Sequence, residues 1–486
     1  MEKSQRQQTI VLIALLAIFA VMYGLLAFVN HINFRTYGLD LGLYNKALYD
    51  YAHLRCCDSS FFLWEPANLL HDHFDLYLML LAPLSLILGQ WTLLVVQIAA
   101  VLAGGLGVYK LIRLYTDNDT LPLLAIVCLM GFFGVWHALG FDYHSNVVAA
   151  MLLPWFFFFL KKRRFGWASF FLLLICIGKE TLPIWMFFVC VALIWDYRKE
   201  GRSLCWIVGW MLFCVIYLLT VTLWLMPMMG EGSSRGFWRY DYMGANFAEM
   251  AGWIVSHPME ALQNLFVNFR GEAGDYGVKA EFYICLLASG LCIAIFKPNY
   301  LVMVIPILGQ KMLAADTGFW GITNQYNVEF APIVVIASFI VLSRLSKPHC
   351  KVALSTLMVA MTLTTTIYTT IHPRSAIRKE NVRLFDVKHF HQPNFSKETA
   401  YRMLGEIPND ALVCATTFFT PHLAMRDSVY IFPMGLGYGA EYYMLKEHDW
   451  CYYEGEEEEI ARLIADTAQY EILDTDGTLY LIHRKK

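Results

Sequence analysis

The chain contains more long apolar segments than a soluble fold can bury. One runs from about residue 9 to 29, and others begin near residues 91, 119, 204 and 351. A helix needs about 20 apolar residues to cross the roughly 30 Å of hydrocarbon in a bilayer. The sequence is 58% hydrophobic and 16% charged, whereas soluble domains carry about 25% charged residues. We therefore predict a polytopic α-helical membrane protein.

The apolar segments predict about eleven crossings. The expected spans are 9–29, 91–114, 119–138, 145–160, 165–178, 181–195, 204–229, 281–296, 299–314, 329–343 and 351–371. Lys3 and Arg6 precede the first span, and basic residues accumulate at the cytoplasmic ends of spans. We therefore expect a cytoplasmic N-terminus and an extracytoplasmic C-terminus. A shorter segment, 76–88, contains Pro83 and predicts an interfacial or half-depth helix.

The stretch 165–195 determines this count. Three loops are rich in lysine and arginine: 161–164, 196–202 and 344–351. These loops all lie inside only if 165–195 forms two short helices that meet at Lys179 and Glu180. A charge at membrane depth costs about 2.5–3.5 kcal/mol unless it is paired or hydrated. We therefore expect a polar cavity at this break.

Short apolar runs replace the long ones beyond about residue 372. The segments 410–417 and 428–432 predict buried strands, and 456–466 predicts an acidic and then apolar helix. Two more short runs flank Asp476-Gly477 and predict a β-hairpin. The tail is therefore expected to form a small α/β domain.

These patterns predict two domains. The first, 1–371, is a transmembrane domain with polar outer loops at 30–90 and 230–280, and the second, 372–486, is an extracytoplasmic α/β domain. No Cys-x-x-Cys pair indicates a zinc site. Whether a disulfide forms is left open for the four cysteines expected outside: Cys56, Cys57, Cys414 and Cys451.

Ionisable residues gather at the ends of spans on the predicted outer face. Asp40 begins the segment 39–51, whose apolar residues recur at a helical period and predict an amphipathic helix on the membrane surface. Asp40 is either the N-cap of this helix or a site residue. His71, His73 and Asp75 follow in the same loop, where the histidines fit a metal site, a contact with lipid phosphate or substrate, or a helix cap.

Later spans bring further polar residues to the same face. Asp142 and His144 lie in a short loop, where turn chemistry is the alternative to a site. Lys179 and Glu180 form either a structural ion pair or part of the cavity at the break. Arg239 belongs to the outer loop 230–280.

Gln325 and Tyr326 begin a span on this side. They either line the cavity or belong to an interfacial aromatic belt.

The chain resembles the bacterial membrane-protein family called domain of unknown function 2079 over most of its length. The matching stretches are "LDLGLYNKALYD", "NLLHDHFDLYLMLLAPL", "FDYHSNVVAAMLLP", "GKET", "RYDYMG" with "SHPMEAL", and "TFFTPHLAMRDSVYIFP". Two positions depart from the family pattern: Thr181 stands in place of a third acid, and Gln325 in place of a histidine. A role that depends on that acid or that histidine is not carried over.

That family is similar to the GT-C superfamily of polytopic glycosyltransferases. These enzymes take a sugar from a polyprenyl-phosphate donor with the help of an acid in the first outer loop. The resemblance implies that Asp40 is this catalytic acid, and that loop 230–280 and the C-terminal domain cover an outer cavity. The residues expected to bind substrate are His71, His73, Asp75, Asp142, His144, Lys179, Glu180, Arg239, Gln325 and Tyr326.

The resulting hypothesis is an inverting sugar transfer in the inner membrane of a bacterium. Asp40 acts as general base or orients the acceptor, which is a glycan, a lipid or a protein. Lys179, Arg239 and the two loop histidines, His71 and His73, neutralise the leaving phosphate. The cofactor is unknown, and a divalent cation near Asp142 is left open.

Two other classes of protein remain alternatives. A transporter or flippase of a lipid-linked or small anionic substrate also places charges at helix breaks, but usually near mid-membrane and with inverted repeats. Here the polar residues cluster towards one face, and no repeat is visible. A non-catalytic scaffold gives no reason for acids at the breaks. No nucleic-acid partner is expected.

Overall fold

The chain forms two compact units that interleave along the sequence. The computed structural model describes residues 2–56, 58–59, 67–230, 237–270, 276–372, 379–391, 395–447 and 455–485. Unit 1 consists of Met1–Leu25, Leu70–Leu76 and Val96–Arg383. Unit 2 consists of Leu26–Leu69, Tyr77–Val95 and Leu384–Lys486. The predicted domain boundary near residue 372 stays a prediction.

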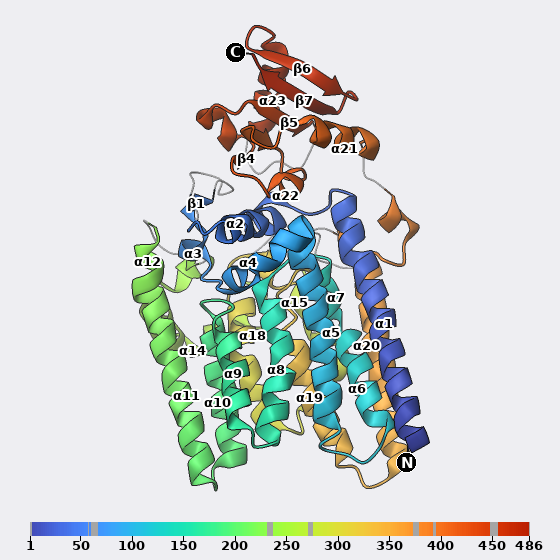
Figure 1. Cartoon of the computed structure of the whole chain (residues 1–486). Helices are drawn as coiled ribbons and strands as arrows, with labels where there is room; N and C mark the ends of the chain where they lie inside the picture. Colours follow the sequence, from blue (N-terminus) through green and yellow to red (C-terminus); the bar gives the residue numbers. More distant parts are fainter. Residues whose placement is uncertain are drawn as a thin grey trace. The chain divides into compact units, whose positions relative to one another are not determined.

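Unit 1 is built from apolar helices. Its longer helices are the first part of α1 (Glu2–Ile32), most of α5 (Thr92–Ile112), α6 (Thr120–Met130), α7 (Phe133–Leu139), α8 (Ser145–Lys161), α9 (Phe165–Cys176), α10 (Leu182–Tyr197), α11 (Gly201–Thr220), α15 (Val278–Leu286), α19 (Phe330–Ser343) and α20 (Pro348–Ile371). Figure 1 shows α8, α9, α10 and α11 side by side.

Several of these helices can cross a membrane. Within the described ranges, four are long and apolar enough: Arg6–Ile32, Tyr77–Ile112, Gly201–Met228 and Pro348–Ile371. The bent pair α6 and α7 would make a fifth, and α8, α9, α10 and α19 are shorter apolar helices. These helices are those of a polytopic membrane protein. The count of about eleven crossings and their orientation stay predictions.

The stretch 165–195 forms two helices, as predicted. α9 ends at Cys176 and α10 begins at Leu182, so that Lys179 and Glu180 lie in the break. Pro183 occupies the first turn of α10, where the proline ring lacks an N–H that would have no partner in any case.

Three predicted spans are broken where one helix was expected. Between α6 and α7 the chain bends by 45°. The Met130 carbonyl accepts hydrogen bonds from the Tyr23 hydroxyl at 2.6 Å and the Trp136 indole at 3.0 Å. The Gly131 carbonyl accepts one from the Thr366 hydroxyl at 2.6 Å. The break is stable because side chains satisfy carbonyls that lipid cannot.

The predicted spans 281–296 and 299–314 are also divided. The first contains α15, a π-helical turn and α16 (Cys292–Ala294), and the second contains α17 (Pro298–Leu301), a 3₁₀ turn and α18 (Ile305–Met312). Gly290 has φ 120°, and a Cβ there would lie 2.2 Å from the Met358 side chain. Only glycine fits this kink without strain.

Unit 1 also contains further short helices. They are α3 (Leu69–Asp72), α12 (Met226–Met228), α13 (Phe247–Ser256) and α14 (Pro258–Asn264). α3 begins one residue before the unit does. α13 begins at Asn246, whose side chain accepts from the backbone N–H groups of Ala248 and Glu249, as expected of a good N-cap.

Unit 2 combines two helices of the N-terminal region with the tail. These are α2 (Leu43–Ala52) and α4 (Tyr77–Leu88), which pack together. A two-residue pair, β1 (Asp58–Ser59) and β2 (Ala67–Asn68), follows α2. α4 buries Tyr77, Leu78, Ala82 and Ser85 and exposes an apolar face that includes Leu80, Leu86 and Ile87. An apolar exposed face is compatible with the predicted interfacial helix.

The tail of unit 2 forms one five-stranded sheet in the order β4-β3-β5-β7-β6. Its strands are β3 (Val413–Ala415), β4 (Val429–Ile431), β5 (Tyr442–Lys446), β6 (Tyr470–Thr475) and β7 (Leu479–Arg484). β3 pairs in parallel with β4 and β5, and β7 pairs antiparallel with β5 and β6. The helices are α21 (Lys397–Glu406), α22 (Thr420–Leu423) and α23 (Glu456–Ala465).

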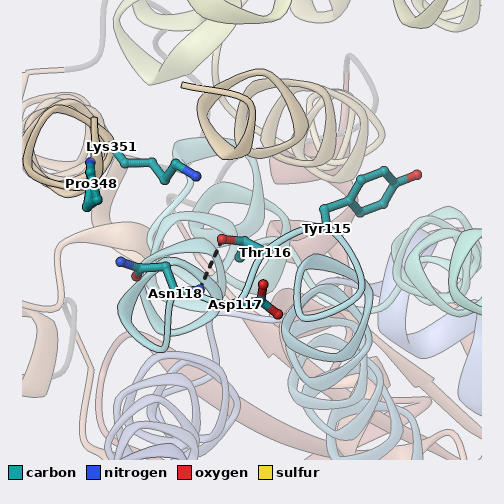
Figure 2. Close-up of a pocket in the computed structure, with 6 residues that line it drawn as sticks. All are labelled: Tyr115, Thr116, Asp117, Asn118, Pro348 and Lys351. Atoms are coloured by element: carbon teal, nitrogen blue, oxygen red, sulfur yellow. Dashed lines mark hydrogen bonds between the residues drawn. The ribbon is translucent and has the colours of Figure 1, made fainter. Parts of the chain in front are cut away.

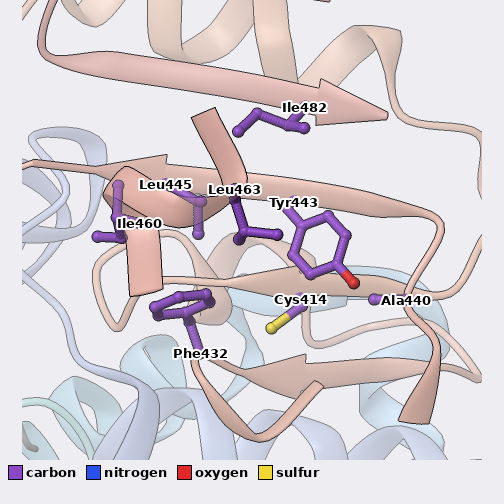
Figure 3. Packing of buried hydrophobic residues seen from close by; sticks show 8 residues of the cluster. All are labelled: Cys414, Phe432, Ala440, Tyr443, Leu445, Ile460, Leu463 and Ile482. Carbon is purple, nitrogen blue, oxygen red and sulfur yellow. The ribbon is translucent and has the colours of Figure 1, made fainter. Parts of the chain in front are cut away.

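The two predicted strands, the acidic helix and the hairpin at Asp476-Gly477 are all confirmed. α23 packs Ile460 and Leu463 against the sheet, and Figure 3 shows the cluster that they complete with Phe432 and Tyr443. Fully burying one such side chain stabilises the fold by about 1.5–3 kcal/mol. The central strand β5 was missed.

Two cysteines expected outside are free thiols. Cys56 is exposed, and Cys414 is buried in the cluster of Figure 3. Cys57 and Cys451 lie outside the described residues.

Candidate functional site

The segment Leu70–Leu76 meets the break between α9 and α10. The Phe74 N–H donates to Glu180 Oε2 at 3.0 Å, and the Leu76 N–H donates to the Ile177 carbonyl at 3.1 Å. His73 Nδ1 lies 3.7 Å from Glu180 Oε1. Of the predicted site residues, the structure therefore brings His73 and Glu180 together.

Glu180 is held in its ionised form. Its burial alone would raise the pKa, but the facing His73 imidazole, the Lys179 charge and a backbone hydrogen bond together lower the pKa to about 2. A carboxylate with this pKa is charged at neutral pH. The break therefore carries a negative charge beside His73.

Lys179, the other charged residue of the break, makes no such contact in the described part of the chain. Across the residues that the structure describes, its ammonium makes no hydrogen bond and no ion pair within 4 Å. Its charge nevertheless acts on two carboxylates, Glu180 and Glu329. Among the described residues, Lys179 and Glu180 form no ion pair within 4 Å, and the Lys179 charge acts on Glu180 from a greater distance.

A second polar cluster lies at the start of α19. The Asn146 side chain donates to Glu329 Oε1 at 2.7 Å and to the Gln325 carbonyl at 3.4 Å. The buried atoms Gln325 Oε1 and Glu329 Oε2 have no hydrogen-bond partner in the described ranges. Lys179 connects the two clusters electrostatically, since it acts on Glu180 in one and on Glu329 in the other.

Asn146 and Glu329 were not among the predicted binding residues. Each lies at the outer end of a predicted span, in the same position as Asp142 or Gln325. This shared position at the end of a span could have identified both as candidate site residues.

Asp142 and His144 are held by a glutamine from the middle of a predicted span. The Gln97 side chain donates to the Asp142 carbonyl at 2.7 Å and accepts from the His144 N–H at 2.8 Å. Asp142 has φ 55°, which is a left-handed conformation that Asp tolerates better than most residues. Turn chemistry therefore explains part of this loop. The sequence feature that was overlooked is Gln97, a fully buried glutamine in an apolar span.

Arg239 and Tyr326 both contact one aromatic ring. The Arg239 guanidinium lies 4.7 Å from the centre of the Phe319 ring, and the Tyr326 ring stacks on Phe319 with centroids 3.9 Å apart. Arg239 Nε also donates to Asp316 Oδ2 at 3.3 Å. The arginine is thus partly neutralised and fixed in orientation.

Two buried lysines hold the loop that carries Phe319. Lys311 donates to the Phe319 and Gly321 carbonyls at 2.5 and 2.6 Å. Lys279 donates to the Met312 and Val267 carbonyls at 3.0 and 3.2 Å. Both were missed, although Lys311 lies within the predicted span 299–314, where a lysine is costly and usually has a function.

His71 and Asp75 are buried on either side of His73. His71 Nδ1 lies 3.0 Å from the Met226 carbonyl, and the Asp75 N–H donates to the His73 carbonyl at 2.8 Å. The neighbouring side chains Leu70 and Phe74 pack against Met226. His71 therefore anchors the segment, whereas His73 faces Glu180. No group of three His, Cys, Asp or Glu side chains in the described part of the chain could hold a metal ion.

Asp40 belongs to unit 2 and is not a helix cap. It lies third in the π-helical turn η1 (Gly38–Gly42), whose N-cap position is occupied by Tyr37. The interpretation of Asp40 as N-cap is therefore wrong. The Gly38 N–H donates to Thr417 Oγ1 at 3.0 Å, and π-helical turns occur often at functional sites.

The helix after Asp40 is less amphipathic than predicted. Eight of its side chains are buried: Leu43, Tyr44, Asn45, Lys46, Ala47, Leu48, Asp50 and Tyr51. Burial of the charged ones is tolerated because Lys46 Nζ pairs with Asp50 Oδ2 at 2.5 Å, and Arg55 pairs with the same carboxylate at 2.9 Å. Burial and these ion pairs therefore hold α2 in place within unit 2.

Known structures share this fold across the whole chain. ArnT from Cupriavidus metallidurans bound to undecaprenyl phosphate aligns with a TM-score of 0.55 at 10% identity, covering 98% of this chain and 97% of that one. Its apo form aligns with a TM-score of 0.52 at 11% identity, covering 98% of both chains. A weaker similarity, with a TM-score of 0.46 and 12% identity, links 90% of this chain to 69% of the Archaeoglobus fulgidus oligosaccharyltransferase.

The fold is therefore that of a GT-C-like polytopic membrane protein. Within that class, the chain belongs to the family of predicted membrane proteins named DUF2079, which matches residues 30–471. No curated protein matches the sequence.

Proposed function

We propose that this protein is a glycosyltransferase that moves a sugar from a polyprenyl-phosphate-linked donor to an extracytoplasmic acceptor, with inversion at the sugar carbon. The single observation that carries the proposal is Lys179. It is a cation at a break between two short apolar helices, and it lacks an ion-pair partner in the described structure. A donor phosphate supplies the missing anion.

The cost of the unpaired charge supports a functional reading. A lysine at membrane depth costs about 2.5–3.5 kcal/mol when nothing offsets it. A charge-assisted hydrogen bond to phosphate contributes about 1.5–3 kcal/mol. The hydrogen bond to the donor phosphate therefore offsets most of the free-energy cost of the unpaired lysine. The similarity to a protein bound to undecaprenyl phosphate agrees with this ligand class.

Two further groups of unit 1 have an acidic neighbour. His73 Nδ1 lies 3.7 Å from Glu180 Oε1, and Arg239 donates to Asp316. The Arg239 guanidinium is thereby directed before the substrate arrives. Preorganised charges stabilise developing negative charge without a reorganisation cost during the reaction. Gln325 and Glu329 offer oxygen acceptors for sugar hydroxyl groups.

The reaction is a single displacement. The acceptor hydroxyl gives its proton to the Asp40 carboxylate, and its oxygen forms a bond to the anomeric carbon of the donor. The bond from that carbon to the phosphate oxygen breaks, and the phosphate leaves with the electron pair towards Lys179. No enzyme nucleophile is needed. The proposal requires Asp40 of unit 2 to approach Lys179 of unit 1.

The proposed membrane topology follows from the distribution of charged residues at the helix ends. The site residues lie at one end of α8, α10 and α19, and basic residues lie at the other end. By the positive-inside rule the site end faces away from the cytoplasm. We propose about eleven crossings, an extracytoplasmic domain over 372–486, and the inner membrane of a bacterium as location.

The test measures binding of undecaprenyl phosphate to the protein in nanodiscs by native mass spectrometry. Lys179→Ala should weaken binding at least tenfold, because about 2 kcal/mol of charged hydrogen bonding is lost. Lys162→Ala is the matched control, since this exposed lysine lies at the basic end and should bind as the wild type does. Equal affinity of wild type and Lys179→Ala would contradict the proposal.

If the protein is a flippase, a turnover assay should give a different result. With polyprenyl-phosphate-linked sugars in the nanodisc, a transferase releases polyprenyl phosphate, whereas a flippase moves intact donor in a vesicle assay. Movement without cleavage would favour the flippase.

A further inference from the structure

Unit 1 contains a second polar site, at the far ends of the helices that carry the first. α8 runs from Ser145 to Lys161, α10 from Leu182 to Tyr197, and α19 from Phe330 to Ser343. With 17, 16 and 14 residues, these helices span roughly 21–26 Å. The second site is therefore separate from Lys179 and Glu180.

This second site is a pocket of about 290 Å³. Its charged lining residues are Lys161, Arg163, Asp196, Glu200, Lys297 and Arg344. Apolar side chains from α8, α10 and α19 form the rest of its wall. The volume suits a headgroup and not a whole lipid.

Two of the four cations are already neutralised. Lys297 Nζ pairs with both carboxylate oxygens of Asp196 at 2.9 Å. Arg163 donates to Glu200 Oε1 at 2.6 Å. These two pairs leave no acidic lining residue for the remaining cations.

Lys161 and Arg344 make no ion pair in the part of the chain that is described. The Lys161 ammonium lies 4.5 Å from the centre of the Tyr115 ring. The pocket therefore carries two surplus positive charges, from four cations and two acids. The lining hydroxyls of Tyr115 and Tyr300 have no hydrogen-bond partner among the described residues and can donate to an anion.

A neighbouring hollow of about 350 Å³ gives a contrast. Tyr115 lines both hollows, and Figure 2 shows its ring pointing away from the other labelled residues. This hollow contains one cation, Lys351, and one acid, Asp117. It has no surplus charge, so it provides a control.

We propose that the pocket lined by Lys161 and Arg344 binds the phosphate headgroup of an anionic phospholipid. The two surplus cations pair with the phosphodiester, the tyrosine hydroxyls donate to its free oxygens, and the apolar walls contact the glycerol. The positive-inside rule places this end in the cytoplasmic leaflet. Basic pockets between helices on that side suit anionic headgroups. The inference does not depend on glycosyl transfer.

The test compares lipid binding to the full-length protein in detergent by native mass spectrometry. Phosphatidylglycerol is the probe, and phosphatidylcholine, a zwitterion with no net charge, is the comparison. The double variant Lys161→Gln with Arg344→Gln should bind phosphatidylglycerol about 30-fold more weakly, from about 1 kcal/mol per basic residue. Lys351→Gln should bind as the wild type does.

A charge-preserving variant separates binding from folding. Lys161→Arg with Arg344→Lys should keep wild-type affinity, and this result excludes a general loss of structure. Equal affinity of the double glutamine variant and the wild type would overturn the proposal. Displacement of phosphatidylglycerol by an equal concentration of inorganic phosphate would also overturn it, because the site would then take free phosphate.

Discussion

Replacing Glu180 by alanine should release the segment Leu70–Leu76 from the α9–α10 break. The Phe74 N–H would lose its acceptor at 3.0 Å, and His73 would lose the carboxylate 3.7 Å away. A hydrogen bond to a charged group contributes about 1.5–3 kcal/mol. His73 and Lys179 lower the pKa of Glu180 to about 2, so the acceptor of this hydrogen bond is a charged carboxylate.

The assay is amide hydrogen exchange of the protein in detergent. A loss of 1.5–3 kcal/mol predicts exchange at Phe74 that is about 10- to 150-fold faster. Glu180→Gln keeps one acceptor oxygen and should give a smaller increase. The Leu76 N–H, which donates to a backbone carbonyl, should change less than Phe74. Unchanged exchange at Phe74 in Glu180→Ala would refute this geometry.

The ionised state of Glu180 predicts a pH dependence. Because the pKa of Glu180 is lowered in the folded protein, its stabilisation is complete above pH 4.5 and is lost as the pH falls towards about 2. The wild type should therefore lose protection at Phe74 over this window, whereas Glu180→Gln should not. A wild-type transition above pH 5 would contradict the assigned direction.

Three further predictions concern the reaction and the two units. Asp40→Asn should lower sugar transfer by about 10²- to 10⁴-fold and leave the thermal midpoint unchanged; full activity would exclude the general-base role. Gly290→Ala should destabilise unit 1 by about 1–3 kcal/mol, because its Cβ would lie 2.2 Å from a side-chain atom of α20. Gly309→Ala, which has open space, is its control in a thermal melt. Leu463→Ala should cost about 2–5 kcal/mol, and the half-exposed Leu473→Ala much less; equal shifts would contradict the packing in Figure 3.

Local rules were sufficient for much of the fold. The two helices on either side of Lys179 followed from charge distribution, and α8 (Ser145–Lys161) followed from apolar length alone. The hairpin at Asp476-Gly477 followed from turn chemistry, since Gly477 has φ 91°. Each of these elements depends on residues that are close in sequence.

The failures come from contacts between distant residues. The kink at Gly290 is stabilised by the Ser338 hydroxyl, which donates to the Gly290 carbonyl at 2.8 Å. β5 lies between β3 and β7 and is buried along most of its length, so its sequence lacks the alternation of a half-exposed strand. No local pattern indicates either feature.

The residues of the candidate site likewise include some that the sequence could predict and some that it could not. His73 and Glu180 could be predicted because both lie at polar breaks between apolar segments. Gln97 and Lys311 could not be assigned roles, because their partners are backbone carbonyls outside their own helices. Sequence shows that such a residue is costly in an apolar span, but not which group satisfies it.

The most direct measurement is a cryo-EM structure of the full chain with undecaprenyl phosphate bound. The account predicts a phosphate oxygen within hydrogen-bond distance of Lys179 Nζ, with Asp40 facing the same cavity. A phosphate bound elsewhere while Lys179 has no anionic partner, or Asp40 and Lys179 on opposite membrane faces, would contradict it.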